Sequence, residues 1–171
     1  HIAYLYSYAG KPWKGYERVR KILTELYTDT PDGLCGNDDC GQMSAWYVMS
    51  AIGLYPVTPG SDRFVFAAPL FSQVRINLED GSVFVVKSDN KKNKYIKGAT
   101  LNGREYEKGY ISFSDIISGG ELSFRTSDKP DYDFAVAQEN RPCSSVDIPF
   151  MRNPWFEYES DIFEDSITFS I

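Results

Sequence analysis

The sequence contains few of the residues that several common catalytic and metal sites require. Only one of its 171 residues, His1, is a histidine. A Ser-His-Asp or Cys-His mechanism supplied wholly by this chain is therefore excluded unless His1 itself serves. The three cysteines, Cys35, Cys40 and Cys143, are odd in number and lack the paired Cys/His spacing of a zinc site. We expect no disulfide framework, and we expect Cys35 and Cys40 to be small buried residues or an occasional disulfide.

The sequence also lacks long apolar runs and clusters of basic residues. No apolar run reaches the ~20 residues that a membrane span requires. The formal net charge is -6, and Lys and Arg nowhere form a block. We therefore expect no membrane span in this chain and no nucleic-acid or anionic-membrane partner. A neutral partner such as a sugar remains open.

Both ends of the sequence read as interrupted structure. The chain begins at His1 without an initiator Met, directly before an apolar stretch, and it ends in a strand-like alternation over residues 166–171. We expect the sequence to be a fragment of a longer polypeptide.

The first third of the chain has helical periodicity. From Lys14 to Thr28 an apolar face alternates with a charged face, which predicts an amphipathic helix. The apolar residues are Tyr16, Val19, Ile22, Leu23, Leu26 and Tyr27, and the charged ones are Glu17, Arg18, Arg20, Lys21 and Glu25. A second helix is predicted over residues 41–52, apolar on nearly every side and therefore buried. Gly53 and Pro56 should end it.

After Pro59 the pattern changes to short runs of period two, separated by Asp80-Gly81, Asn102-Gly103 and Gly119-Gly120. These runs predict antiparallel strands over residues 74–78, 83–85 and 110–114. Helices followed by strands favour two packed layers over a parallel βαβ sheet. The polar stretch from Asp128 to Pro154 reads as a linker before a new strand-rich unit.

The segment between the two predicted helices carries the chemistry. Asn37, Asp38 and Asp39 precede a helix start, where free N–H groups and a partial positive charge keep a carboxylate ionised. One interpretation is structural: Asp39 is an N-cap, and Gln42 completes a capping box. The other is catalytic: an ionised carboxylate acts as the general base of an inverting glycosidase, with the general acid roughly 6.5–9.5 Å away and supplied from elsewhere.

Other candidate residues have both structural and functional interpretations. Asp and Asn oxygens suit Ca²⁺, although the spacing around residues 37–39 does not match a helix–loop–helix calcium site. His1 is either a structural histidine or a site residue, and Tyr4 is core or pocket wall. Trp13 is core or a platform for a sugar ring.

An ordered set of motifs resembles one family. The motifs are Tyr4-Leu5-Tyr6, Gly10-Lys11-Pro12-Trp13, residues 36–47 (GNDDCGQMSAWY), Tyr55-Pro56, Pro59-Gly60, Ala68-Pro69-Leu70-Phe71, residues 99–103 (ATLNG) and Gly119-Gly120-Glu121-Leu122. Together they are similar to the end of the catalytic region of glycoside hydrolase family 92, the calcium-dependent exo-α-mannosidases, from His1 to about Pro130.

This resemblance implies a fold and a division of the chain. Residues 1–58 would be the last helices of an (α/α) six-hairpin barrel, and residues 59–130 an antiparallel β-sandwich portion, giving an α + β fold class. Residues 131–153 would be a linker. Residues 154–171 are similar to the start of a small fibronectin-III-associated β repeat of bacterial secreted glycosidases.

The resemblance also implies an activity: inverting, Ca²⁺-dependent hydrolysis of terminal α-linked mannose from glycans. Asp39 matches the general base, and Asn37 and Asp38 would position the water. Asn37 departs from the aspartate found there in some members. His1, Tyr4 and Trp13 would bind substrate, and the region of residues 37–39 is the metal candidate. The general acid and other residues of the pocket would come from the missing N-terminal part, so the fragment should be inactive alone, and the whole protein should be secreted, periplasmic or at the cell surface.

Two alternatives predict different surfaces. If the chain is catalytic, Asp39 should point into a cleft lined by His1, Tyr4 and Trp13. If it is a non-catalytic carbohydrate-binding module, exposed aromatics of the β portion, such as Tyr95, Tyr106 or Tyr110, should stack on glycans. A structural spacer would have no acidic, oxygen-rich pocket at all.

Overall fold

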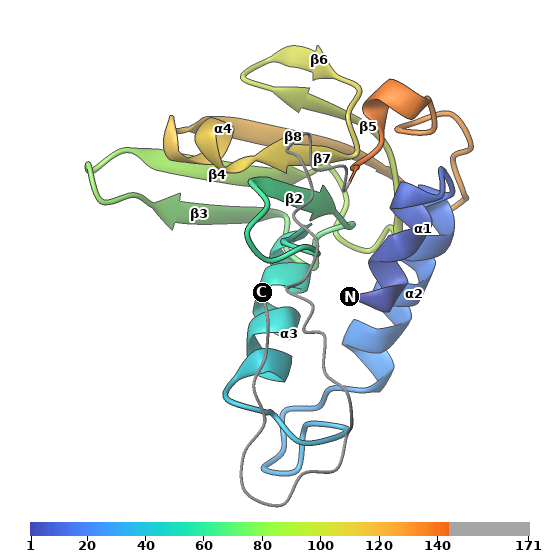
Figure 1. Cartoon of the computed structure of the whole chain (residues 1–171), viewed down its shortest axis with the longest axis vertical. Helices are drawn as coiled ribbons and strands as arrows, with labels where there is room; N and C mark the ends of the chain where they lie inside the picture. The colour runs from blue at the N-terminus through green and yellow to red at the C-terminus, as the bar shows by residue number, and fades with distance from the viewer. Residues whose placement is uncertain (144–171) are drawn as a thin grey trace, which may run out of the picture.

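The computed structural model describes residues 1–143. Figure 1 shows helices on one side and lower end of the molecule and β-strands at its upper end. A 3-10 turn, η1 (Ile2–Tyr4), leads into the short helix α1 (Leu5–Tyr8). None of the helices among residues 1–143 has the length and apolar character that crossing a bilayer requires.

Helix α2 (Pro12–Glu25) is the predicted amphipathic helix, displaced by two to three residues. It begins at Pro12 because proline has no N–H to lose in the first turn. Tyr16, Val19 and Leu23 are buried, which confirms the apolar face. Arg20 departs from the prediction, because its side chain turns into the protein instead of facing solvent.

Helix α3 (Gln42–Ile52) ends as predicted at Gly53, whose φ of 96° is a left-handed cap. Its predicted burial is wrong for the described part of the chain. Only Trp46, Ser50 and Ala51 are buried, and Val48 is 55% exposed. The reason is that α3 packs on one face only, against α2 and β1.

The strands form two sheets. The three-stranded sheet has the order β1-β2-β7 and is antiparallel, and the five-stranded sheet has the order β3-β4-β8-β5-β6. Their bounds are β1 (Leu54–Tyr55), β2 (Arg63–Phe66), β3 (Gln73–Asn77), β4 (Val83–Ser88), β5 (Tyr95–Leu101), β6 (Arg104–Tyr106), β7 (Tyr110–Ser112) and β8 (Gly120–Ser127). The antiparallel prediction holds except for β4 and β8, which pair in parallel.

One predicted strand ends early. The run over residues 110–114 leaves the strand at Ser112, where helix α4 (Phe113–Ile117) begins. Ser112 and Asp115 form a capping box: the serine hydroxyl accepts from the Asp115 N–H at 3.1 Å, and the aspartate accepts from the Ser112 N–H at 3.3 Å. These local hydrogen bonds favour a helix start at this point, although the period-two pattern predicts a strand.

The two sheets and α2 share one apolar core. Phe66 of β2 meets Phe124 of β8 edge to face, with ring centroids 5.0 Å apart. Tyr16 of α2 lies in the same cluster. The described chain is thus a mixed α/β structure with two sheets and few helices. The finer description as part of an (α/α) barrel followed by a sandwich, with a boundary near residue 58, stays a prediction.

Residues 131–143, predicted to begin a linker, are instead packed against the β-sheets. Ala135 is buried, Phe134 packs on the core, and the Gly109 N–H donates to the Asn140 carbonyl at 2.8 Å. A short 3-10 turn, η2 (Gln138–Asn140), completes this segment. The remaining linker residues and the predicted β repeat over residues 154–171 lie outside the described residues.

Candidate active site

The segment that carries the acidic residues, residues 33–41, is the acid loop. It follows a tight turn in which the Thr28 N–H donates to the Gly33 carbonyl at 3.0 Å. A Cβ at position 33 would lie 2.2 Å from the Thr28 carbonyl oxygen, so only glycine fits. The acid loop lies at the lower end of the molecule, away from the sheets (Figure 1).

Asp38 has a structural task. Its carboxylate accepts from the backbone N–H of Ser44 at 2.9 Å and from the Ser44 hydroxyl at 3.0 Å. Ser44 is in the first turn of α3, where N–H groups have no partner within the helix. The Asp38 carboxylate therefore caps α3. Capping motifs in the sequence do not reveal this role, because the partner lies six residues away.

Asp39 does not cap the helix. The N-cap residue is Gly41, which has no side chain of its own to cap the helix, so the predicted capping box of Asp39 and Gln42 is wrong. The Asp39 side chain is exposed and makes no hydrogen bond or ion pair with any residue in the described range 1–143. Of the two neighbouring carboxylates, that of Asp39 is therefore available to contact a substrate or a water molecule.

The backbone at Asp39 is strained. Asp39, Cys40 and Gly41 have φ values of 50°, 62° and 86°, three consecutive left-handed residues of which only one is glycine. Left-handed conformations cost energy for residues with a Cβ and persist where the surroundings impose them, often at functional sites. The loop is anchored here by the hydrogen bond from the Met43 N–H to the Asp38 carbonyl.

Aromatic side chains support the acid loop from α3. Tyr27 stacks on Trp46 with ring centroids 5.9 Å apart, and its hydroxyl donates to the Met43 carbonyl at 3.2 Å. Burial, followed by the nearby Cys35 and Asp38, raises the pKa of the Tyr27 hydroxyl. These contacts fix the loop to the start of α3.

Tyr4 belongs to the core. It is 1% exposed, its hydroxyl donates to Ser50 Oγ at 2.8 Å, and its ring stacks on Tyr55 with centroids 4.9 Å apart. Burial raises the pKa of Tyr4. Of its two predicted placements, core or pocket wall, the described residues support the core. His1 is exposed, and its carbonyl accepts from the Tyr4 N–H at 2.9 Å.

Trp13 lies at the opposite end of α2 from the acid loop. The 14 residues of α2 span about 20 Å, and Trp13 stands in its first turn. The Trp13 ring instead meets Tyr132 edge to face, with centroids 5.0 Å apart. The described residues thus do not bring His1, Tyr4, Trp13 and Asp39 into one cleft, and their substrate-binding roles stay predictions.

The described residues do not assemble a metal site. No group of three or more His, Cys, Asp or Glu side chains within residues 1–143 is placed to hold one ion. Both Asp38 oxygens are engaged by Ser44. Ca²⁺ needs six to eight oxygen ligands, which Asn37 and Asp39 cannot supply by themselves.

Cys35 and Cys40 are exposed and free, contrary to the expectation of burial or a disulfide.

Two hollows among residues 1–143 bear on the site. One, of about 440 Å³, lies beside the acid loop and is lined by residues 27–31, 33 and 34 together with Ser44, Tyr47 and Val48. The other, of about 540 Å³, lies over β5, β6 and β8 and is lined by several carboxylates. Of these two hollows, the more acidic one thus lies in the β portion. Sequence reasoning missed it because Asp131 and Asp133 fell in a stretch read as linker.

The aromatic residues proposed for a binding module are not exposed platforms. Tyr95 is 4% exposed. Tyr106 is half-buried, and its hydroxyl donates to the Tyr110 carbonyl at 3.0 Å. Arg63 lies over the ring of half-buried Tyr110, 4.9 Å from its centroid. These contacts leave no open row of rings on the sheets.

The chain is similar in sequence to a glycosidase and in structure to solved α-mannosidases. A secreted glycosidase from Arthroderma benhamiae, named as uncharacterised, is 34% identical over 146 residues, covering 82% of this chain and 19% of the relative. A family GH92 α-mannosidase of Bacteroides thetaiotaomicron, solved with mannoimidazole, is 42% identical with a TM-score of 0.80, covering 84% of this chain and 19% of that chain. A family GH92 inverting mannosidase of the same organism is 39% identical with a TM-score of 0.79, covering 84% of this chain and 20% of that one.

The chain spans about a fifth of the length of these relatives. It matches the glycosyl hydrolase family 92 catalytic domain over residues 1–128. Since this match covers most of the 171 residues, the chain belongs to glycosyl hydrolase family 92.

Proposed function

We propose that this chain supplies the general base of an inverting α-mannosidase that removes terminal α-linked mannose from glycans. The single observation that carries the proposal is the Asp39 carboxylate, which has no hydrogen-bond or ion-pair partner among residues 1–143 and is held on a left-handed backbone beside a capped helix. The solved relatives, one of them named an inverting mannosidase, support the substrate class and stereochemistry.

In the proposed reaction Asp39 accepts a proton from a water molecule. The water oxygen bonds to the anomeric carbon as the glycosidic C–O bond breaks on the opposite face, and a general acid protonates the departing oxygen. That acid belongs to the rest of the longer polypeptide, so we propose that this chain is inactive alone. Asn37 is exposed two residues from Asp39 and is our candidate for positioning the water, whereas the cap on Ser44 leaves Asp38 less free to share this role.

Calcium dependence is a separate part of the proposal. The described residues do not complete a calcium site, so no step of the reaction is assigned to the ion, and its ligands would come mainly from other segments. Secretion is likewise proposed from the relative named a secreted glycosidase. Recovery of activity from the extracellular or periplasmic fraction of the source cells would test it.

The test is mannose release from α-mannosides by the complete protein and its Asp39→Asn variant. Loss of a general base should lower kcat by about 10²- to 10⁴-fold while the unfolding temperature is unchanged. Asp29→Asn, which alters an exposed carboxylate of the preceding turn, is the matched control and should keep full turnover. Proton NMR of the first product should show β-mannose, and a chelator should abolish the activity.

Near-normal turnover in Asp39→Asn would remove Asp39 from the mechanism and move the search for the base outside the acid loop. Initial release of α-mannose would contradict inversion. Undiminished activity after exhaustive chelation would contradict the calcium requirement alone.

The runner-up is a non-catalytic carbohydrate-binding or structural β module. The hollow over the five-stranded sheet is the one observation that favours binding by the β portion. It is compatible with catalysis by the complete protein.

A further inference from the structure

Tyr27 contacts both ends of the acid loop. It follows the end of α2, and its backbone pairs with Leu34 in an isolated antiparallel bridge. Its hydroxyl reaches the start of α3 and donates to the Met43 carbonyl at 3.2 Å. The acid loop therefore begins beside the backbone of Tyr27 and ends beside its side chain.

The ring of Tyr27 is held by two rings of α3. It stacks on Trp46 with the ring planes 12° apart, and it tilts against Tyr47 with centroids 4.9 Å apart. Trp46 is itself buried. Aromatic pairs of this geometry are stabilised beyond the area that they bury. The packing therefore keeps the Tyr27 hydroxyl directed at the Met43 carbonyl.

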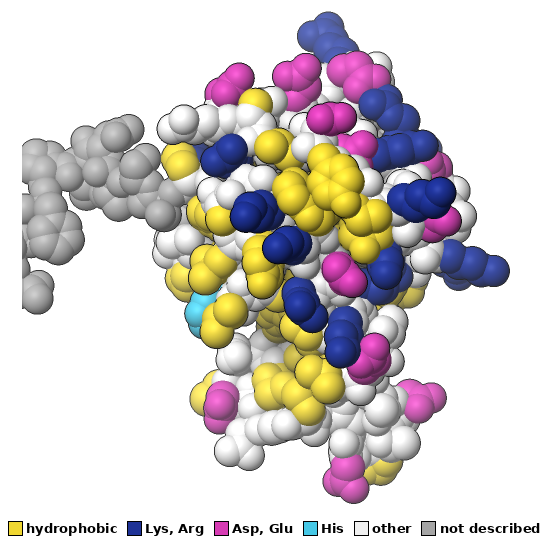
Figure 2. All heavy atoms as spheres, turned by 90° about the vertical axis from the view of Figure 1, so that its right-hand side faces the viewer, with side chains coloured by type: hydrophobic (Ala, Val, Ile, Leu, Met, Phe, Trp, Pro, Cys, Tyr) yellow, Lys and Arg dark blue, Asp and Glu magenta, His cyan; other side chains and the backbone are white. Residues whose placement is uncertain are grey.

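Ion pairs do not hold the acid loop. Residues 22–62 contain no Lys or Arg. Figure 2 shows Asp and Glu side chains but no Lys or Arg at the lower end of the face that it presents, which is the level of the acid loop in Figure 1. Among residues 1–143 no cation fixes the Asp39 carboxylate. Its position therefore depends on the backbone that carries it.

The backbone of Asp39 is tied to the turn that Tyr27 holds. The Asp39 carbonyl accepts from the Gln42 N–H at 3.3 Å, and the Asp38 carbonyl accepts from the Met43 N–H at 3.2 Å. Both donors belong to the first turn of α3, to which the Tyr27 hydroxyl is bonded. The left-handed conformation of Asp39 persists only where the surroundings impose it. Loosening this turn would let the acid loop relax and the carboxylate move.

The Tyr27 hydroxyl stays a hydrogen-bond donor at every pH at which a carboxylate base titrates. Burial, followed by the nearby Cys35 and Asp38, raises the pKa of this hydroxyl above the ordinary tyrosine value of 10.0. An ordinary aspartate titrates near pH 4. The hydroxyl can therefore hold the acid loop without exchanging protons itself.

We propose that Tyr27 is a positioning residue: its hydroxyl holds the first turn of α3, and with it the Asp39 carboxylate, in the geometry at which a water molecule is deprotonated. This inference rests on the role proposed for Asp39. A displacement of about 1 Å can lower a rate about 10²-fold, so this one hydroxyl should affect turnover more than it affects stability.

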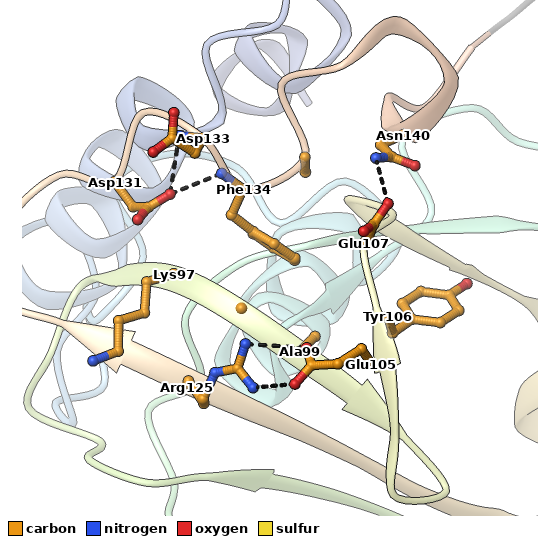
Figure 3. A pocket seen from close by; sticks show the side chains of 12 residues that line it. Lys97, Ala99, Glu105, Tyr106, Glu107, Arg125, Asp131, Asp133, Phe134 and Asn140 are labelled. Carbon is orange, nitrogen blue, oxygen red and sulfur yellow. Dashed lines mark hydrogen bonds and ion pairs between the residues drawn. The ribbon is translucent and has the colours of Figure 1, made fainter.

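The test is steady-state hydrolysis of an aryl α-mannoside by the complete protein. Tyr27→Phe keeps the ring and removes the hydroxyl, and it should lower kcat about tenfold with KM nearly unchanged. Tyr106→Phe is the matched control, because the Tyr106 hydroxyl also donates to a backbone carbonyl, that of Tyr110 at 3.0 Å, but lies on β6 (Figure 3). It should lower the unfolding midpoint as Tyr27→Phe does and keep full turnover. All assays are run well below the lowest unfolding midpoint.

A double-variant cycle separates positioning from a general loosening of the fold. Once Asp39→Asn has removed the base, adding Tyr27→Phe should change kcat by less than about twofold, because effects that act through one group are not additive. Full turnover in Tyr27→Phe, or the same tenfold loss in the Asp39→Asn background, would overturn the role of Tyr27 and leave Asp39 as the base. Near-normal turnover in Asp39→Asn would contradict the proposed base, and the role of Tyr27 with it.

Discussion

At the scale of single residues, two adjacent carboxylates have different tasks because their backbones differ. Asp38 points back to the first turn of α3 and is held by Ser44. Asp39, one residue further, is turned outward by a left-handed φ of 50°. The cap lets the strained backbone persist, since it ties the loop to a helix that is itself anchored by Tyr27 and Trp46.

This difference predicts that Asp38 contributes to stability. Asp38→Ala leaves the Ser44 N–H without its acceptor and should lower the free energy of unfolding by about 1 kcal/mol, the usual worth of a helix cap. Urea unfolding monitored by circular dichroism measures it, with Asp39→Asn as the neighbouring control, because asparagine tolerates the left-handed backbone as aspartate does. Equal losses in both variants would show that Asp38 is not the cap.

At the scale of elements, Arg20 joins α2 to the β portion. Its guanidinium donates to the carbonyls of Ala68, Pro69 and Asn93 at 3.2, 3.1 and 2.8 Å, and to the Lys91 carbonyl at 3.2 Å. These carbonyls belong to two different loops of the β portion. A planar guanidinium with several donors can serve both loops at once, whereas an ammonium cannot.

We predict that Arg20→Ala lowers the free energy of unfolding by about 3 kcal/mol, because hydrogen bonds to a charged group are lost and the carbonyls lose their partner. Arg20→Lys should retain only a minor part of the stabilisation that Arg20 provides. The exposed Arg18 on the same helix is the control, and Arg18→Ala should change stability by less than about 0.5 kcal/mol. Comparable losses of stability in Arg20→Ala and Arg18→Ala would contradict the role of Arg20 in joining α2 to the β portion.

At the scale of the whole molecule, buried tyrosines hold the layers together. Tyr4 lies between the helices and β1, and Tyr16 lies in the core shared with the sheets. Burial raises the pKa of both hydroxyls, and burial raises the pKa of Tyr106 to about 12. An ordinary tyrosine in the unfolded chain titrates near pH 10.

The folded state therefore binds these protons more tightly than the unfolded state. Their contribution to stability is fully present below about pH 10 and is lost as the pH rises through the raised folded values. We predict cooperative unfolding above pH 10, with part of the 12 tyrosines ionising only as the fold is lost. Ultraviolet absorbance of tyrosinate and circular dichroism, recorded together, check this; complete ionisation of all tyrosines with the fold intact would refute it.

The sequence by itself determined the local structure and the family. Apolar spacing located α2 and α3, Gly53 marked the end of α3, and the motifs around residues 36–47 identified family 92. These features depend on neighbouring residues, whose propensities and spacing are written in the chain order.

Only the tertiary structure decided how distant segments meet. It turned Arg20 inward, exposed Val48 on α3, paired β4 with β8 in parallel, and packed residues 131–143 on the sheets. It also separated Trp13 from the acid loop by the length of α2 and gave the capping role to Asp38. These outcomes depend on which apolar surfaces the other elements leave exposed and on which backbone carbonyls lack a hydrogen-bond donor. Both depend on the three-dimensional arrangement, which the order of residues in the chain does not show directly.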